Sequence, residues 1–173
     1  MVVFPDVDIP AAARGAIRGM NFARSQGQSC QSTSRVYVHR DSVDGFTDEI
    51  LRLVAAFVVG DPLDEGTDLG PLAYRAHFER VLGYSDAGVE DGATPLAGGQ
   101  TDRTPGYCVD PVVFGNVTQD MRIAREEIFG PVMSLIEWSD VDEVTEFAND
   151  TSFGLTAAIW TNDVNVAHRM ARD

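Results

Sequence analysis

Short apolar runs alternate with segments of helical periodicity along this chain, and that order constrains its fold more than any other feature. Strands are predicted near residues 2–4, 34–39, 94–96, 108–114, 132–138 and 155–161. Helices are predicted near residues 9–23, 43–58, 72–88, 121–127 and 139–148, with a last one from residue 163 onward. Strands that alternate with helices pack as a largely parallel sheet covered by those helices. The sequence therefore predicts an α/β fold, with a mostly parallel sheet flanked by helices, in one domain over residues 1–173.

Two of the predicted helices carry clear local signals. Apolar residues recur at helical spacing from residue 43 to residue 58, and Gly60-Asp61-Pro62 ends that pattern. Ser139 and Asp142 have the spacing of a capping box, so Ser139 is predicted to open the 139–148 helix.

Lysine is absent from the sequence, so all 13 basic residues are arginines, against 27 acidic residues. The absence excludes a lysine Schiff base, a phosphate-loop lysine and a lysine general base. The formal net charge of −14 would repel phosphate groups, so neither nucleic acid nor an anionic membrane is an expected partner. The same composition fits adaptation to high salt or a biased base composition of the genome, which the sequence does not distinguish.

The sequence contains two cysteines, Cys30 and Cys108, without the spacing of a disulfide framework or a zinc site. No metal site is predicted. No run approaches the ~20 apolar residues that a membrane-spanning helix needs, and the N-terminal residues do not resemble a secretion signal. The expected location is the reducing cytoplasm.

The first segment that points to a chemistry is Gly27–Cys30, which reads Gly-Gln-Ser-Cys and precedes the strand-like run Ser34–Val38. It resembles the aldehyde dehydrogenase superfamily around its nucleophile, where a Gly-Gln dipeptide precedes the reactive cysteine by one residue. The resemblance implies that Cys30 is the catalytic nucleophile, since a thiolate can attack an aldehyde carbon to form a thiohemiacetal. Hydride transfer to a nicotinamide then leaves a thioester, which is hydrolysed. Cys108 lies in no such context and is expected to be an ordinary strand residue.

A second segment, Arg125–Val132, reads Arg-Glu-Glu-Ile-Phe-Gly-Pro-Val and looks like the most recognisable motif of the same family. The resemblance implies that Glu127 binds the hydroxyls of the nicotinamide ribose and that Phe129 packs beside that part of NAD or NADP. Glu126 is expected to be structural. His77 falls where family members often place a polar residue that touches the adenosine ribose, which makes it a third candidate cofactor contact. The alternative for His77 is an ordinary surface position on a helix.

Weaker matches in the family's order, such as residues 58–63, 68–72, 106–111 and 149–155, extend the resemblance over nearly the whole chain. In the family, a dinucleotide-binding half precedes the region that starts at Met1, and an oligomerisation segment follows the region that ends at Asp173. The resemblance thus implies an incomplete catalytic domain, without the general-base glutamate, the oxyanion-binding asparagine and most of the cofactor pocket. We expect the isolated chain to be inactive and to form a homo-oligomer or bind a chain that supplies the missing half.

Three functions stay open on the sequence alone. The first is the catalytic portion of an NAD(P)-dependent aldehyde dehydrogenase that oxidises an aldehyde to a carboxylic acid. The second is a non-catalytic remnant or interaction module of the same fold, and the third is a residual thiol esterase that uses Cys30 without a cofactor. The presence of Cys30, Glu127 and Phe129 in their motifs favours the first. The sequence reveals neither which aldehyde is oxidised nor whether the cofactor is NAD or NADP.

Overall fold

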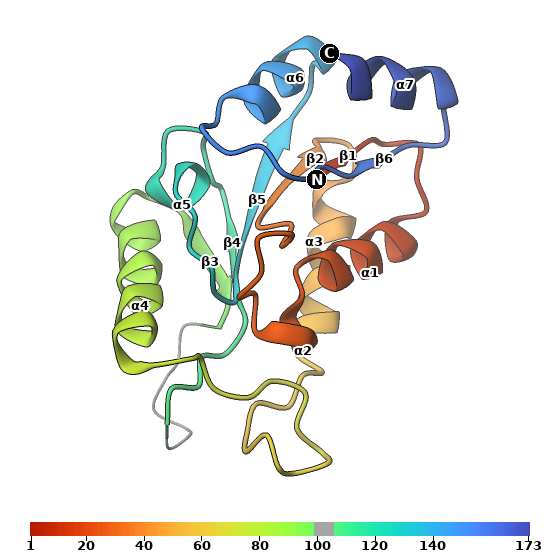
Figure 1. Cartoon of the computed structure of the whole chain (residues 1–173). Coiled ribbons are helices and arrows are strands. Elements are labelled where there is room, and N and C mark those ends of the chain that lie inside the picture. The colour runs from red at the N-terminus through yellow and green to blue at the C-terminus, as the bar shows by residue number, and fades with distance from the viewer. Residues whose placement is uncertain (99–105) are drawn as a thin grey trace.

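The fold is built on a single sheet whose strands run mostly in parallel. A computed structural model of the chain describes residues 1–98 and 106–173. In these residues, six strands lie in the order β3-β4-β5-β2-β1-β6 (Figure 1). Their bounds are β1 Val2–Val3, β2 Arg35–His39, β3 Thr94–Ala97, β4 Val112–Gly115, β5 Val132–Trp138 and β6 Ile159–Trp160. All neighbouring strands are parallel except β3 and β4, which confirms the predicted mostly parallel sheet.

Helices cover both faces of this sheet, as predicted for an α/β fold. Their bounds are α1 Ile9–Gly19, α2 Phe22–Ser25, α3 Val43–Val54, α4 Arg75–Glu90, α5 Arg122–Arg125, α6 Val141–Asn149 and α7 Val164–Arg172. The helices α1 and α3 pack together on one face (Figure 1). The helices α4 to α7 contribute side chains to the core on the opposite face. None of the helices in the described part of the chain is both long and apolar enough to cross a bilayer.

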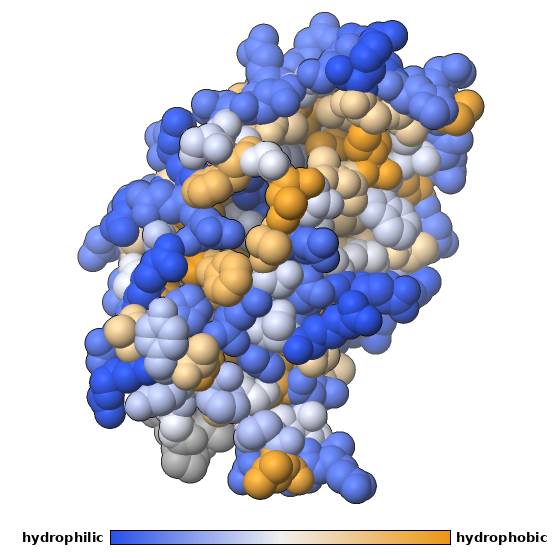
Figure 2. Space-filling view, viewed as in Figure 1, coloured by the Kyte–Doolittle hydropathy of each residue, from blue (hydrophilic) through white to orange (hydrophobic). Residues whose placement is uncertain are grey.

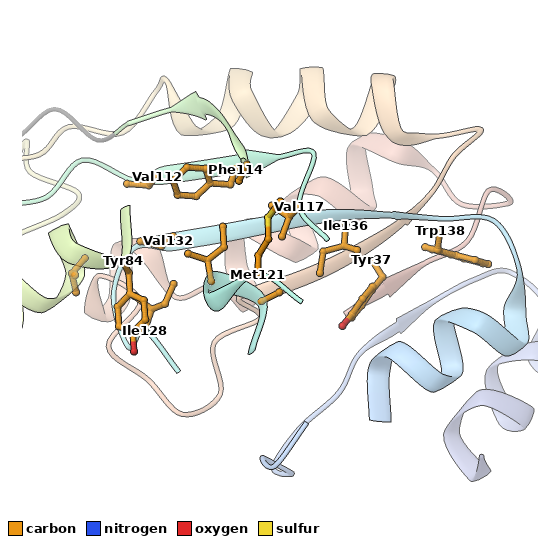
Figure 3. Packing of buried hydrophobic residues seen from close by; sticks show 14 of the residues in the cluster. Tyr37, Tyr84, Val112, Phe114, Val117, Met121, Ile128, Val132, Ile136 and Trp138 are labelled. Atoms are coloured by element: carbon orange, nitrogen blue, oxygen red, sulfur yellow. The ribbon is translucent and has the colours of Figure 1, made fainter. Parts of the chain in front are cut away.

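Side chains of β5 alternate between two hydrophobic cores. Met133 and Leu135 join the core beneath α1 and α3, whereas Val132 and Ile136 join the core beneath α4 to α7 (Figure 3). Glu137 is the one exposed residue of this strand. A strand that is buried on both faces is typical of the centre of a parallel sheet. This position explains why residues 132–138 form a nearly uninterrupted apolar run.

The strand β1 joins the two ends of the chain. It pairs with β2 on one side and with β6 on the other, with Val2 opposite both Tyr37 and Ile159. The amino group of Met1 continues this ladder by donating a hydrogen bond to the carbonyl of Arg35 at 2.8 Å. Burial, reinforced by the nearby Arg35 guanidinium, lowers the pKa of this amino group to about 5.

Two predicted helices begin or continue differently from the prediction. The predicted 9–23 helix is divided into α1 and α2, because Asn21 adopts a left-handed backbone with φ of 59° that the helix cannot continue through. The prediction that Ser139 caps the 139–148 helix was wrong. Asp140 is the N-cap of α6, and its carboxylate accepts hydrogen bonds from the N–H groups of Asp142 and Glu143 at 3.0 and 3.1 Å. A carboxylate at this position also interacts favourably with the helix dipole.

Two predicted strands are shorter in the structure. The strand β4 begins only at Val112, so Cys108 is buried in the segment that precedes it rather than in a strand. The strand β6 covers only Ile159–Trp160 of the predicted run 155–161. The residues just before β6 are exposed and leave the sheet to line the cavity described below.

Candidate active site

The loop that carries Cys30 leaves the short helix α2 through a left-handed turn. Gln26 and Gly27 have φ of 53° and 71°, and Cys30 lies exposed three residues further on. The Gln28 side chain holds the loop, because its amide nitrogen donates to the Ser25 carbonyl at 3.0 Å and its oxygen accepts from the Ala73 N–H at 3.0 Å. The Gly-Gln pair ahead of the cysteine therefore shapes and anchors the loop.

Two hydroxyl side chains anchor the loop on its other side. The Ser32 hydroxyl shares its one proton between the carbonyls of Met20 and Gly27, at 3.1 and 3.2 Å. Thr33 donates to the carbonyl of Ala16 at 3.3 Å. Cys30 thus lies between segments that are tied to α1 and to the approach of α4. These anchors fix the loop on both sides of Cys30, while the cysteine itself stays exposed.

Residues 126–130, called the strap below, form the second part of the site. Phe129 has φ of 59°, a left-handed conformation that costs a bulky residue about 1–2 kcal/mol. The Glu126 carboxylate accepts a hydrogen bond from the Tyr84 hydroxyl at 2.7 Å, in agreement with a structural role. The Glu127 carboxylate is exposed and makes no hydrogen bond or ion pair with any residue of 1–98 or 106–173. Of the two adjacent carboxylates, Glu127 is therefore the one that no other residue of these ranges engages.

The loop and the strap are in direct contact through two glycines. A methyl group built on Gly27 would lie 2.2 Å from the backbone oxygen of Gly130, so only glycine permits this approach. The contact brings together two motifs that are far apart in the sequence. Cys30, Glu127 and Phe129 consequently line one cavity of about 830 Å³.

The far wall of this cavity comes from β6 and the residues that precede it. Phe153, Leu155 and Ile159 line it, and the first two are 55% and 66% exposed. Figure 2 shows apolar side chains at the surface in the middle of the same face. The resemblance covers residues 149–155 and does not predict that they line this cavity.

Arg35 and Tyr37 of β2 line the inner wall of the same cavity. The Arg35 guanidinium donates to the Tyr37 hydroxyl at 2.9 Å, and that hydroxyl donates to the Gln119 side-chain oxygen at 2.9 Å. Burial raises the pKa of Tyr37, so its hydroxyl stays protonated and keeps this donor role. No group of three or more His, Cys, Asp or Glu side chains within the described ranges could hold a metal ion.

His77 lies behind the strap instead of on the cavity wall. Its side chain is 6% exposed, which differs from the surface position considered as the alternative. Its Nε2 atom lies 2.7 Å from the Phe129 carbonyl oxygen, and its ring lies between those of Tyr74 and Phe129. The cofactor contact that the resemblance implies for His77 stays a prediction, and the structure places the side chain against the strap backbone.

The fold and the site place the chain among α/β proteins with an exposed thiol and an exposed carboxylate that line one cavity. Residues 1–173 match the Aldehyde dehydrogenase family, and the chain belongs to that family.

Named relatives and solved structures agree with this membership. The chain is 45% identical over 174 residues to the betaine aldehyde dehydrogenase of Brucella anthropi, covering 98% of this chain and 35% of that protein. It is 42% identical over 179 residues to the 4-trimethylaminobutyraldehyde dehydrogenase of Rattus norvegicus, covering 100% and 36%. A Bacillus cereus aldehyde dehydrogenase solved as a complex with NAD+ has a TM-score of 0.94 and 37% identity, over 99% of this chain and 34% of that one. The chain therefore spans about a third of the length of these relatives.

Proposed function

We propose that residues 1–173 are an incomplete catalytic domain of an NAD(P)-dependent aldehyde dehydrogenase, with Cys30 as its nucleophile. One observation carries the proposal: Cys30, Glu127 and Phe129 line the same cavity, although they come from distant parts of the sequence. Family membership and the activities named for the relatives support the same assignment. We place the protein in the reducing cytoplasm, because the chemistry needs Cys30 as a thiol.

In this proposal, the Cys30 thiolate attacks the carbonyl carbon of an aldehyde. A carbon–sulfur bond forms, and the carbonyl oxygen takes up the negative charge of the thiohemiacetal. NAD(P) supplies the hydride acceptor when it is bound. Loss of hydride from the carbon leaves a thioester on Cys30, and water cleaves it to release the acid and restore the thiol. The exposed position of Cys30 on an anchored loop suits this sequence of steps.

Glu127 and Phe129 have the chemistry needed to hold the nicotinamide ribose of NAD(P). An unpartnered carboxylate has the acceptor atoms that ribose hydroxyls need, and the partly exposed Phe129 ring, at 37%, offers an apolar surface beside it. We assign the binding of the nicotinamide ribose to Glu127 and Phe129. Neither residue discriminates between NAD and NADP.

The proposed reaction also needs an oxyanion donor and a general base, which the rest of the enzyme must contribute. A single oxyanion donor is typically worth about 10²–10³ in rate, and a positioned base adds a comparable factor. We therefore expect the chain alone to be inactive and to act with a polypeptide that supplies the dinucleotide-binding half, or within a homo-oligomer. The exposed Phe153 and Leu155 beside the cavity are suited to such a contact.

The first test is NAD(P)H formation by the purified chain with a panel of aldehydes, including betaine aldehyde and 4-trimethylaminobutyraldehyde. Wild type, Cys30→Ser and Cys108→Ser are compared, and none should produce NAD(P)H. Turnover that is lost only in Cys30→Ser would refute the incompleteness of the domain while supporting the nucleophile.

The second test is binding of NAD(H), followed by saturation-transfer NMR on the chain and on Glu127→Gln. Glu79→Gln, an exposed glutamate on α4, is the matched control. Transfer to the nicotinamide-ribose protons should fall in Glu127→Gln alone. Equal transfer in both variants would remove Glu127 from the cofactor site.

A further inference from the structure

Two side chains of α4 hold the strap by its backbone. The His77 Nε2 atom lies 2.7 Å from the Phe129 carbonyl oxygen, and an Arg80 guanidinium nitrogen donates to the Glu127 carbonyl oxygen at 2.5 Å. The two donors are three residues apart and so lie on one face of the helix. The two carbonyls flank Ile128, which is buried and holds the strap on the core.

Arg80 is itself held in place by the neighbouring side chains. Its guanidinium lies 5.3 Å from the centre of the Tyr84 ring, and the Tyr84 hydroxyl donates to the Glu126 carboxylate. Neither Arg80 nor His77 lines the cavity. His77 and Arg80 therefore contact the strap through the backbone of Glu127 and Phe129 and not through their side chains.

We propose that His77 and Arg80 are positioning residues that set the strap and, through it, the Cys30 loop. The path of contacts runs from α4 to the strap, and then from the Gly130 backbone oxygen to Gly27 of the loop. The relevance of this path to catalysis rests on the proposed function. The path itself is a property of the fold in the absence of any ligand.

The acceptors of these two hydrogen bonds are backbone carbonyl oxygens, and they define which replacements of His77 and Arg80 can keep the bonds. A carbonyl oxygen only accepts hydrogen bonds, so the His77 Nε2 atom must carry the proton. Glutamine offers an N–H donor on a side chain of similar reach, and alanine offers none. Lysine in place of Arg80 keeps the charge and offers three rotatable N–H donors. His77→Gln and Arg80→Lys should therefore keep the strap in place, while His77→Ala and Arg80→Ala should release it.

The test measures two properties of the ligand-free chain. The first is the rate at which iodoacetamide alkylates Cys30, with Cys30→Ser identifying the adduct by mass. The second is deuterium uptake of the peptide that contains the strap. Both alanine variants should change the alkylation rate by at least about threefold and raise uptake in the strap. The glutamine and lysine variants should restore wild-type values, and Arg75→Ala, on the same helix but away from the strap, should have no effect.

Two results would overturn the proposal. One is wild-type alkylation and wild-type uptake in both alanine variants. The other is uptake that rises equally in all peptides and is not restored by the conservative replacements, since that pattern reports a general loss of stability. Arg80 is exposed, so Arg80→Ala alone decides the matter should His77→Ala fail to fold. Neither readout needs NAD, so failure of cofactor binding would leave this result standing.

Discussion

Replacing Gly27 by alanine tests the contact that joins the Cys30 loop to the strap. The added methyl group would lie 2.2 Å from the Gly130 oxygen and must move by about 0.8 Å to reach 3.0 Å, the shortest separation that real side chains tolerate. Alanine at a left-handed φ of 71° costs about 1–2 kcal/mol, and overpacking typically adds about 1–3 kcal/mol. The free energy of unfolding should therefore fall by about 2–5 kcal/mol.

The chain offers two matched controls for this substitution. Gly92 also has positive φ, at 99°, but a methyl group there would meet nothing within 4 Å, so Gly92→Ala isolates the backbone cost of about 1–2 kcal/mol. Gly83 lies inside α4 with open space around it, so Gly83→Ala should stabilise the chain by about 0.5–1 kcal/mol. Urea unfolding followed by circular dichroism gives the three values. The reasoning is refuted if Gly27→Ala is no more destabilising than Gly92→Ala and leaves the alkylation rate of Cys30 unchanged.

Three further predictions concern stability. Lowering the pH from 8 to 5 should cost the chain about 3 kcal/mol, because the unfolded state protonates the Met1 amino group while its depressed folded pKa, about 5, resists protonation. Urea unfolding at a series of pH values checks this, and an added residue before Met1 should remove the effect. Asp140→Ala should lower stability by about 1 kcal/mol, with no change for Ser139→Ala, in the same assay. Tyr37→Phe should cost about 1–2 kcal/mol by leaving the Gln119 side chain without its donor, and an unchanged melting temperature would contradict this.

The architecture was within reach of sequence reasoning because it depends on local periodicity. The apolar run at residues 132–138 is central in the sheet and buried on both faces, and both properties follow from the chain's own pattern. The cap of α6 was harder to place, since Ser139 and Asp140 are adjacent residues that are both able to cap. The choice between them is made by where β5 ends, which the pattern leaves uncertain by a residue or two.

The candidate site was predictable only in part. Cys30, Glu127 and Phe129 were identified by resemblance, and the structure brings them to one cavity, while their roles stay predictions. The partner of His77 could not be predicted from the sequence, because it depends on the left-handed turn at Phe129 that directs a carbonyl toward α4. Arg80 carried no sequence signal at all, since an arginine on a helix surface is usually solvated.

The pairing of β1 with β6 determines how firmly one wall of the cavity is held. The strand is only two residues long, yet it provides the hydrogen-bonded partner of β6, and α7 beyond β6 has no buried residue of its own. Residues 153–159 are therefore held to the domain in part through a contact between the two ends of the chain, where Asp6 also accepts hydrogen bonds from Thr161 and Asn162, and such a long-range contact is slow to form. Amides of β6 should exchange with solvent by local opening long before those of β5. One side of the cavity would then loosen while the thiol, the strap and the central sheet keep their places.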